Sequence, residues 1–253
     1  MRTPAPTIDV MIQARMGSTR LPGKVLLPLG DTTALGMMLT RVRRATRPRH
    51  LVVLTTRLGE DDELADAARR HGAFVFRGTV DDVLGRYAEA ACQYGSDAVV
   101  RLTGDCPFAD PGMIDEMCRV FQDGWPRLDF VTNCLRRTYP RGLDVEILSR
   151  RVLETLHTRC REEYYREHVV PYVEEHPDEF RVAEHLNAVD ESEYRLTLDT
   201  RADYDTIVNV YGLFGHDRFL YRELIGAVRE HPHLLVNAAV AHKAYRTSSE
   251  VCE

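Results

Sequence analysis

Residues 12–24 form a short segment whose side chains suit the binding of a polyanion. The segment reads IQARMGSTRLPGK and follows an apolar run. It carries three cations, two glycines and two hydroxyl groups: Arg15, Arg20, Lys24, Gly17, Gly23, Ser18 and Thr19. Backbone N–H groups in glycine turns can hold phosphate oxygens, while the cations supply fixed positive charge. We therefore interpret the segment as a triphosphate-binding loop at the end of a strand.

The spacing within this loop excludes two common nucleotide-binding motifs. A P-loop has four residues between its glycines and a Ser or Thr after its lysine. Here five residues separate Gly17 from Gly23, and Val25 follows Lys24. The loop also lacks the G-x-G-x-x-G spacing of a dinucleotide fold. The alternative interpretation is a solvated basic surface loop, because Arg and Lys side chains are mostly exposed.

Two aspartates follow apolar segments and are candidates for binding a metal ion beside a triphosphate. Asp105 lies in the turn TGDCP at residues 103–107, and Asp199 ends the alternation YRLTLD at residues 194–199. Magnesium prefers oxygen ligands and usually takes one or two from the protein. Each aspartate also has a structural alternative. Asp105 is suited to capping its own turn, and Asp199 to capping the helix expected at Ala202–Tyr211.

The loop resembles the N-terminal signature of the sugar-acid cytidylyltransferases, the superfamily that includes the acylneuraminate and Kdo enzymes, and within it the SpsF-like branch. Asp105 and Asp199 match the positions of that family's two metal-binding aspartates. The resemblance therefore implies that Mg²⁺ binds at both, and that Arg15 and Lys24 act with them in catalysis. The residues implied to contact CTP are Ala14, Gly17, Ser18, Arg20, Arg86 and Thr103.

Arg86 is included because residues 81–86, DDVLGR, resemble the start of the family's nucleotide-contacting helix. Its structural alternative is an exposed helix arginine that pairs with Asp82 at the i,i+4 spacing. The sequence leaves both interpretations open.

The acceptor site is predicted from residues 141–146 and 161–168, which are characteristic of the SpsF-like branch. The candidate residues are Arg141, Asp144, Glu146, Glu163 and His168. Asp144 and Glu146 share one face of a strand, since successive side chains alternate. His168 suits either a base or an anion contact, with an ordinary pKa near ~6.5. Solvated surface positions are the alternative for each of these residues.

The sequence departs from the classical Kdo and sialic acid enzymes after the magnesium turn, where their sugar-binding segments are not found. Proteins of the SpsF-like branch also occur in phosphonate pathways. Arg136, Arg137 and Arg141 flank Tyr139-Pro140, and arginine forks bind phosphonate or carboxylate bidentately. A sugar acid and a small phosphonate are therefore both candidate acceptors.

The resemblance implies a magnesium-dependent cytidylyltransferase, in which an anionic acceptor attacks the α-phosphorus of CTP and pyrophosphate leaves. Relatives are often dimers, so a homodimer is expected. A nucleotide-sugar-dependent glycosyltransferase and a non-catalytic nucleotide-binding regulatory module are the alternatives, because fold-level analogy does not exclude them.

Composition argues against other classes of protein. The net charge of −6 gives no reason to expect nucleic-acid or membrane partners.

The only lysines are Lys24 and Lys243, so a lysine in the phosphate loop stands out. The six cysteines lack C-x-x-C pairing and zinc spacing, and we expect reduced thiols. No apolar targeting segment or run of ~18 apolar residues is found, and a cytoplasmic protein is expected. A frayed polar tail is predicted after about Arg246.

The elements that must position these residues follow a βαβ rhythm. Strands are predicted at Val10–Gln13, Leu51–Thr55, Ala73–Phe76 and Ala98–Leu102, and helices at Thr33–Thr46, Asp61–His71, Val80–Tyr94 and Pro111–Gln122. After about residue 123 we predict strands at Asp129–Thr132 and Leu143–Leu148, helix from Ser149 to Glu175 with an interruption at Pro171, and an extended pair within Arg181–Leu198.

These elements predict an α/β fold with a mostly parallel twisted sheet and flanking helices, plus a small accessory lobe or hairpin. The resemblance makes this a nucleotidyltransferase fold, similar to the GT-A fold. Residues 1–253 are expected to form a single domain. Its CTP-binding half covers about residues 1–123, and its acceptor-binding and dimerisation half covers about residues 124–246.

Overall fold

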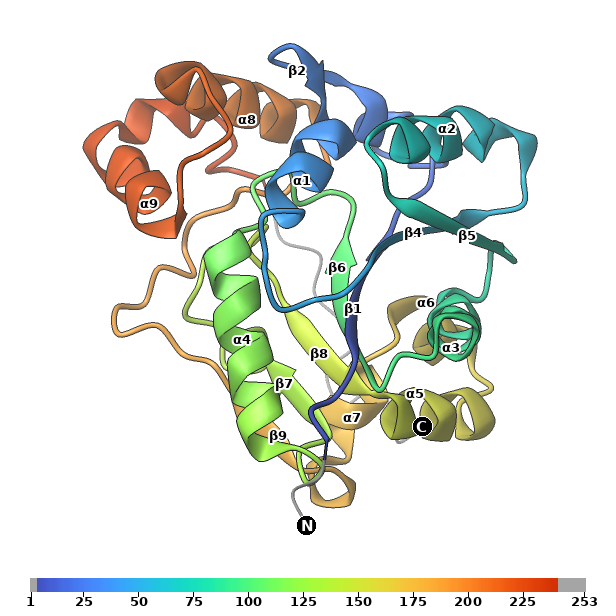
Figure 1. The fold of residues 1–253 in the computed structure, drawn as a ribbon. Coiled ribbons are helices and arrows are strands. Elements are labelled where there is room, and N and C mark those ends of the chain that lie inside the picture. Colours follow the sequence, from blue (N-terminus) through green and yellow to red (C-terminus); the bar gives the residue numbers. More distant parts are fainter. Residues whose placement is uncertain (1–3, 241–253) are drawn as a thin grey trace, which may run out of the picture.

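The computed structural model describes residues 4–240 and has one central sheet with helices on both faces (Figure 1). Its strands, in spatial order, are β5 (Phe74–Gly78), β4 (Leu51–Thr56), β1 (Ile8–Gln13), β6 (Ala98–Thr103), β8 (Glu146–Ser149), β7 (Phe130–Thr132) and β9 (Val182–Glu184). Within this sheet only β8 runs antiparallel to its neighbours. The predicted mostly parallel α/β sheet is confirmed.

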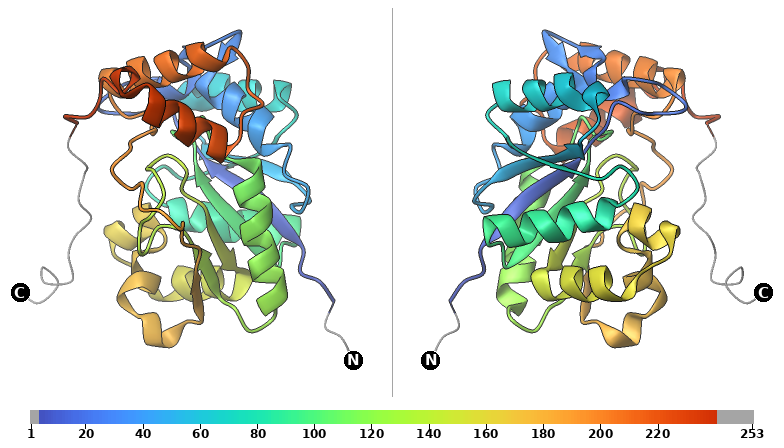
Figure 2. Two further views of the ribbon diagram at one scale, coloured as in Figure 1. Left: turned by 90° about the vertical axis from the view of Figure 1, so that its left-hand side faces the viewer. Right: turned by 90° about the vertical axis from the view of Figure 1, so that its right-hand side faces the viewer.

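Helices cover both faces of the sheet (Figure 2), and the buried apolar side chains form one layer on each face. One layer contains α1 (Ala34–Val42), α2 (Asp62–Arg70), α4 (Pro111–Gly124), α8 (Arg201–Phe214) and α9 (Tyr221–Glu230). The other contains α3 (Val83–Tyr94), α5 (Arg150–Arg159), α6 (Glu163–His168) and α7 (Pro171–Glu175). Side chains of β6 alternate between the layers, with Val100 in the first and Val99 in the second. The sheet is therefore buried on both faces.

Short elements complete the described chain. The 3-10 helices are η1 (Lys24–Leu26), η2 (Gly59–Asp61), η3 (Pro177–Glu179) and η4 (Pro232–Leu234). β2 (Pro28–Leu29) and β3 (Thr32–Thr33) form a small antiparallel hairpin directly after the predicted phosphate loop. No helix within residues 4–240 is long and apolar enough to cross a membrane. Lys243, Cys252 and the tail predicted after Arg246 lie outside the described residues.

The strands and helices predicted for the first half are all present, and their ends differ by a few residues. Asp110 caps α4, since its Oδ1 accepts a hydrogen bond from the Met113 amide at 2.8 Å. α3 begins at Val83 instead of the predicted Val80. Its cap is Asp82, whose Oδ1 accepts from the Gly85 amide at 2.7 Å.

The second half departs further from the prediction. The expected helix from Ser149 to Glu175 is divided into three helices, and Pro171 begins the last of them. A proline suits the first turn of a helix, where no amide hydrogen bond is lost. A break before α6, over residues 160–162, was not predicted. The five cysteines within residues 4–240 are all free, as expected.

Two predicted strand regions are only partly present, and in the first of them a side chain takes the hydrogen bonds of the backbone. β8 begins at Glu146 and not at Leu143. The Asn133 side chain donates to Leu143 O at 2.8 Å and accepts from Val145 N at 2.9 Å. The extended pair expected within Arg181–Leu198 reduces to β9 and a bridge between Arg141 and Arg195.

Candidate active site

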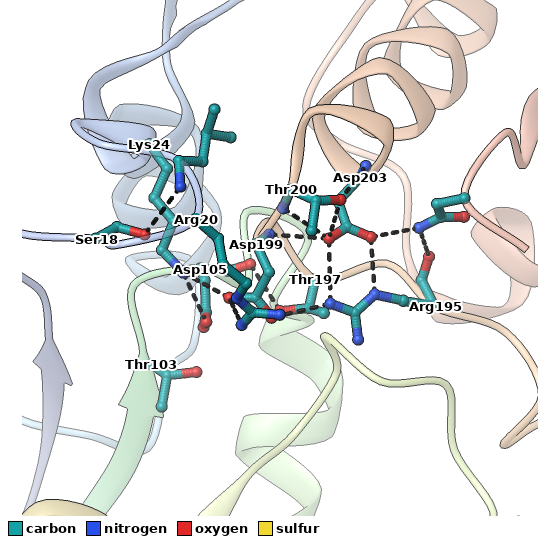
Figure 3. A network of polar contacts seen from close by, with 12 residues as sticks. Ser18, Arg20, Lys24, Thr103, Asp105, Arg195, Thr197, Asp199, Thr200 and Asp203 are labelled. Atoms are coloured by element: carbon teal, nitrogen blue, oxygen red, sulfur yellow. Dashed lines mark hydrogen bonds and ion pairs between the residues drawn. The ribbon is translucent and has the colours of Figure 1, made fainter. Parts of the chain in front are cut away.

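Three segments that are distant in sequence meet at Lys24, the first residue of η1. The Nζ atom of Lys24 lies 2.8 Å from Asp199 Oδ1 and 3.2 Å from Asp105 Oδ2 (Figure 3). Asp105 belongs to the turn after β6, and Asp199 directly precedes the residue that caps α8. Both carboxylates therefore face one point, which is occupied by an ammonium group.

The predicted phosphate loop folds back on itself and is bound by a residue of η2. Met16 O accepts hydrogen bonds from Ser18 N at 2.8 Å and Gly23 N at 3.0 Å. Met16 N donates to the buried carboxylate of Asp61 at 2.7 Å. Burial opposes ionisation of Asp61, but hydrogen bonds from Met16 and Thr56 outweigh it and lower its pKa. An ionised carboxylate thus anchors the loop.

The loop, the Asp105 turn and the Asp199 segment are in direct backbone contact. Gly104 N donates to Gln13 O at 2.8 Å, and a Cβ atom at Gly104 would lie 2.8 Å from the Cβ of Ala14. On the other side, Leu198 N donates to Asp105 O at 2.7 Å. A side chain at position 104 would push the phosphate loop away from the turn, so glycine is needed there.

Charge and burial have opposite effects on ionisation at this point, and charge has the larger effect. Burial disfavours the ammonium of Lys24, but Asp105 and Asp199 outweigh that effect and raise its pKa. Burial likewise opposes ionisation of Asp105, while the charge of Lys24 and a hydrogen bond from Thr103 lower its pKa. Lys24 and Asp105 are therefore both charged near neutral pH.

The carboxylate pair suits magnesium better than ions that need larger ligand sets. No group of three or more His, Cys, Asp or Glu residues that could hold a metal is present in residues 4–240. Asp105 and Asp199 nevertheless contact the same cationic atom of Lys24. Magnesium usually takes one or two protein carboxylates and completes its shell with water and phosphate oxygens. The residues present fit such an ion.

Asp199 is not a helix cap, so that alternative is wrong. Thr200 caps α8, and its Oγ1 accepts from Asp203 N at 3.2 Å. Asp203 returns the interaction by accepting from Thr200 N at 2.9 Å. The side chain of Asp199 instead receives three cations. Besides Lys24, these are Arg20, at 3.0 Å from Oδ1, and Arg195, at 2.9 Å from Oδ2.

The other predicted nucleotide contacts lie within the loop or at the end of β6. Arg15 is exposed and forms no hydrogen bond or ion pair with the described residues, and Gly17 is also exposed. Ser18 Oγ accepts from Leu21 N at 3.4 Å, so its hydroxyl shapes the loop. The Thr103 hydroxyl lies 3.3 Å from Cys106 Sγ.

Arg86 is buried, and the alternative of an exposed Arg86–Asp82 pair is wrong. Only 4 % of Arg86 is exposed, and its Nη1 donates to Thr79 O at 3.2 Å. Asp82 instead forms an ion pair with Arg166. The Nε of Arg86 has no hydrogen-bond partner among the described residues. Burial lowers its pKa and the charge of Arg15 adds to this lowering, so the two guanidinium groups share one electrostatic environment.

The predicted acceptor residues divide into paired and exposed positions. Asp144 pairs with Arg137, and the buried Glu146 pairs with Arg101 across β6 and β8. The carbonyl oxygen of His168 accepts from Arg101 Nη2 at 3.2 Å, and its ring lies 5.0 Å from that of Tyr164.

Arg141 is positioned through its backbone, and Glu163 is exposed. Arg141 N donates to Tyr194 O at 3.0 Å, and Leu196 N donates to Arg141 O at 2.7 Å. These bonds join the predicted acceptor segment to the strand-like segment that ends at Asp199. Glu163 lies in the first turn of α6, and its side chain forms no hydrogen bond or ion pair with the described residues.

Three residues behind Asp199 were not among the predicted site residues, namely Arg195, Asp203 and Asn237. Asp203 is fully buried and is bound by Arg195 Nε at 2.7 Å and Asn237 Nδ2 at 2.7 Å. Two patterns in the sequence could have indicated Arg195 and Asp203. Arg195, Thr197 and Asp199 alternate and so share a face, and Thr200-x-x-Asp203 resembles a capping box. No local pattern pointed to Asn237.

The sheet topology and the charged site at its strand ends define a nucleotidyltransferase, as comparisons with known proteins show. The family model for cytidylyltransferases matches residues 10–245, and the chain belongs to this family. A solved cytidylyltransferase from Leptospira borgpetersenii is 44% identical, with a TM-score of 0.90, and the match covers 95% of this chain and 100% of that one.

Curated relatives agree with this assignment. The spore coat polysaccharide biosynthesis protein SpsF of Bacillus subtilis is 36% identical over 209 residues, covering 79% of this chain and 85% of SpsF. The 3-deoxy-manno-octulosonate cytidylyltransferase of Geobacter sulfurreducens is 36% identical over 111 residues, covering 43% of each chain. Membership of this family assigns nucleotidyl transfer to the chain, in preference to the alternatives of a glycosyltransferase and a non-catalytic regulatory module.

Proposed function

We propose that this cytidylyltransferase is magnesium-dependent and transfers CMP from CTP to an anionic small molecule, a sugar acid or a small phosphonate. The observation that carries the proposal is the convergence of Asp105 and Asp199 on the ammonium of Lys24, next to a glycine-containing cationic loop. In the reaction, an acceptor oxygen forms a bond to the α-phosphorus. The bond from that phosphorus to the bridging oxygen breaks, and pyrophosphate leaves with the electron pair.

The chain's own groups bind and orient the triphosphate. Lys24 and Arg20 move from the carboxylates to phosphate oxygens when CTP enters, and Arg15 is exposed and available to bind them as well. Backbone amides at Gly17 and Ser18 add hydrogen bonds. Such transfer needs little covalent help from the protein, so positioning and charge neutralisation account for most of the rate.

Asp105 and Asp199 would hold the magnesium ion. When bound, the ion neutralises charge on the phosphate oxygens. Asp105 is held by the turn after β6, and Asp199 is held by the hydrogen bond from Leu198 N to Asp105 O. Their carboxylates therefore need little rearrangement to bind the ion.

Arg86 is proposed to contact the nucleotide, and its unpartnered Nε supports this role. A buried donor without a partner is costly in a folded protein, and a ligand acceptor would remove that cost.

For the acceptor, the anionic class is supported by Arg141, whose segment is bonded to the one that ends at Asp199. The relation to SpsF and to a 3-deoxy-manno-octulosonate cytidylyltransferase favours a sugar acid. Asp144, Glu146, Glu163 and His168 are the further acceptor contacts that we propose. A homodimer and a cytoplasmic location stay predictions, and light scattering of the purified protein would test the first.

The test is pyrophosphate release with each of the four nucleoside triphosphates and Mg²⁺, against sugar acids, small phosphonates and simple carboxylates. Release with CTP and one acceptor class would establish the reaction and name that class. Asp105→Ala should lower turnover by roughly 10²–10³-fold, while Asp123→Ala, at an exposed position on α4, serves as the control. Full turnover by a folded Asp105→Ala protein would contradict the proposal.

A further inference from the structure

The two carboxylate oxygens of Asp199 have different partners. Oδ1 faces the centre of the site, where Lys24 lies at 2.8 Å and Arg20 at 3.0 Å. Oδ2 faces away from it and accepts from Arg195 Nη2 at 2.9 Å (Figure 3). The side chain is thus held with one oxygen directed into the site and the other engaged behind it.

Arg195 is itself held by a second carboxylate. Its Nε donates to Asp203 Oδ1 at 2.7 Å, and its Nη2 donates to Asp203 Oδ2 at 3.1 Å. Arg195 is 7% exposed and Asp203 is fully buried. A planar guanidinium in a bidentate pair has a fixed orientation, which a flexible ammonium would not have. The Nη2 that contacts Asp199 is therefore fixed in place.

Asp203 is fixed in turn from two directions. Its Oδ2 accepts from the backbone amides of Asp199 at 3.1 Å and Thr200 at 2.9 Å. Its Oδ1 accepts from Asn237 Nδ2 at 2.7 Å, and the same Asn237 group donates to Arg195 O at 3.1 Å. Asn237 is 2% exposed. Residues after α9 thus support the site without touching its centre.

We infer that Arg195, held by Asp203 and Asn237, is a positioning residue that limits Asp199 to one-oxygen binding of a divalent cation and thereby favours Mg²⁺ over Ca²⁺. The inference rests on the proposed function, in which Asp199 is a metal ligand. Magnesium needs near-ideal octahedral geometry and suits a carboxylate that offers one oxygen. Calcium takes more ligands and often binds carboxylates through both oxygens, which the Arg195 contact prevents.

A purely structural role would leave this arrangement unexplained. Arg195 and Asp203 already satisfy each other through two hydrogen bonds, which is sufficient for a buried ion pair. The further contact to Asp199 fixes the rotation of a carboxylate that faces Lys24. Loss of a structural pair would lower stability, but it would not change the preference between two divalent cations.

The test measures CTP affinity by calorimetry in Mg²⁺, in Ca²⁺ and in EDTA, without acceptor. The variants are Arg195→Met and Asn237→Ala. The second variant leaves the charges of Arg195 and Asp203 in place, and also the contact between Arg195 and Asp199. The control is Arg201→Met. Arg201 is an exposed arginine at the start of α8 that pairs with Asp205 at 2.9 Å and does not touch Asp199.

The wild-type protein should bind CTP more tightly with Mg²⁺ than with Ca²⁺. In Arg195→Met the ratio of the two affinities should shift toward Ca²⁺ by roughly fivefold or more, because Oδ2 of Asp199 becomes free to bind the ion. Asn237→Ala should shift it in the same direction by a smaller factor. CTP affinity in EDTA should stay within about twofold in both, and Arg201→Met should match the wild type.

An unchanged ratio in folded Asn237→Ala and Arg195→Met proteins would overturn the inference and leave the proposed function intact. Equal CTP affinity of the wild type in Mg²⁺, Ca²⁺ and EDTA would instead overturn the metal role of Asp199, and the inference with it.

Discussion

Lys24 Nζ lies 2.8 Å from Asp199 Oδ1 across 175 positions of sequence. The same nitrogen contacts Asp105 Oδ2 at 3.2 Å, so one ammonium is shared by both proposed metal ligands. Two carboxylates that face each other without a cation repel, and burial increases that repulsion. Lys24 therefore stabilises the arrangement in the absence of metal, and its charge becomes available to the triphosphate when a metal ion binds.

Replacement of Lys24 by Met should separate these two roles. The protein should lose about 1–3 kcal/mol of unfolding free energy without metal, because Asp105 and Asp199 lose their shared partner. Added Mg²⁺ should raise its melting temperature more than that of the wild type, while turnover falls by roughly 10²–10³-fold. Thermal unfolding with and without Mg²⁺ measures the first effect. Equal responses of both proteins to Mg²⁺ would contradict it.

Arg86→Met tests the buried guanidinium with a free Nε. The KM for CTP should rise by roughly tenfold or more, with a smaller change in kcat, because a ground-state contact to the nucleotide is lost. Steady-state pyrophosphate release against CTP concentration measures this. Arg69→Met is a matched control, since Arg69 lies on the exposed face of α2 and pairs with Asp66. A KM equal to that of the control would refute a nucleotide contact.

Gly142 has a backbone conformation that other residues rarely adopt, with φ of +98°. A Cβ atom there would also lie 2.4 Å from the carbonyl carbon and oxygen of Leu196, in the segment that leads to Asp199. Gly142→Ala should therefore destabilise the protein by about 1–3 kcal/mol and lower turnover as Asp199 shifts. Chemical denaturation and activity assays would show both effects.

The control for this change lies in α8. A Cβ atom at Gly212 would meet no atom within 4 Å, so Gly212→Ala should stabilise the protein by about 0.5–1 kcal/mol. If Gly142→Ala were as well tolerated as Gly212→Ala, the close contact with Leu196 would not restrict position 142.

Glu174 on α7 gives a prediction for pH. Burial, with the nearby charge of Glu146, raises its pKa from 4.5 to about 7. Between these values the folded protein binds more protons at this position than the unfolded chain does. The free energy of unfolding therefore falls as pH rises through this window. Glu174→Gln should remove the fall and gain roughly 1–3 kcal/mol relative to the wild type at pH 8, with little difference near pH 4.5.

Urea denaturation from pH 4.5 to 8 measures this difference. The half-buried histidines His71 and His185 have pKa values lowered by partial burial, so they add stability as pH rises, equally in both proteins. Glu154→Gln, an exposed position on α5, is the control. A wild-type-like pH profile for Glu174→Gln would show that Glu174 does not titrate in this range.

The first half of the fold was predictable because its signals are local. β1, β4, β5 and β6 are apolar runs separated by amphipathic helices, and Asp110-Pro111 starts a helix by a capping interaction within four residues. Residues 143–145 and 185–193 were mispredicted. Side chains such as Asn133 take backbone hydrogen bonds there, and which side chain does so depends on distant parts of the chain.

The sequence by itself determined the family, the cationic glycine loop and the two aspartates, because each is a short pattern with a direct chemical meaning. Only the tertiary structure decided that Lys24 lies between Asp105 and Asp199, that Arg86 is buried, and that Arg195, Asp203 and Asn237 support the site. These facts depend on side chains brought together by the packing of helices against one sheet. A linear pattern specifies which residues follow one another, but it does not specify which charges share one buried space.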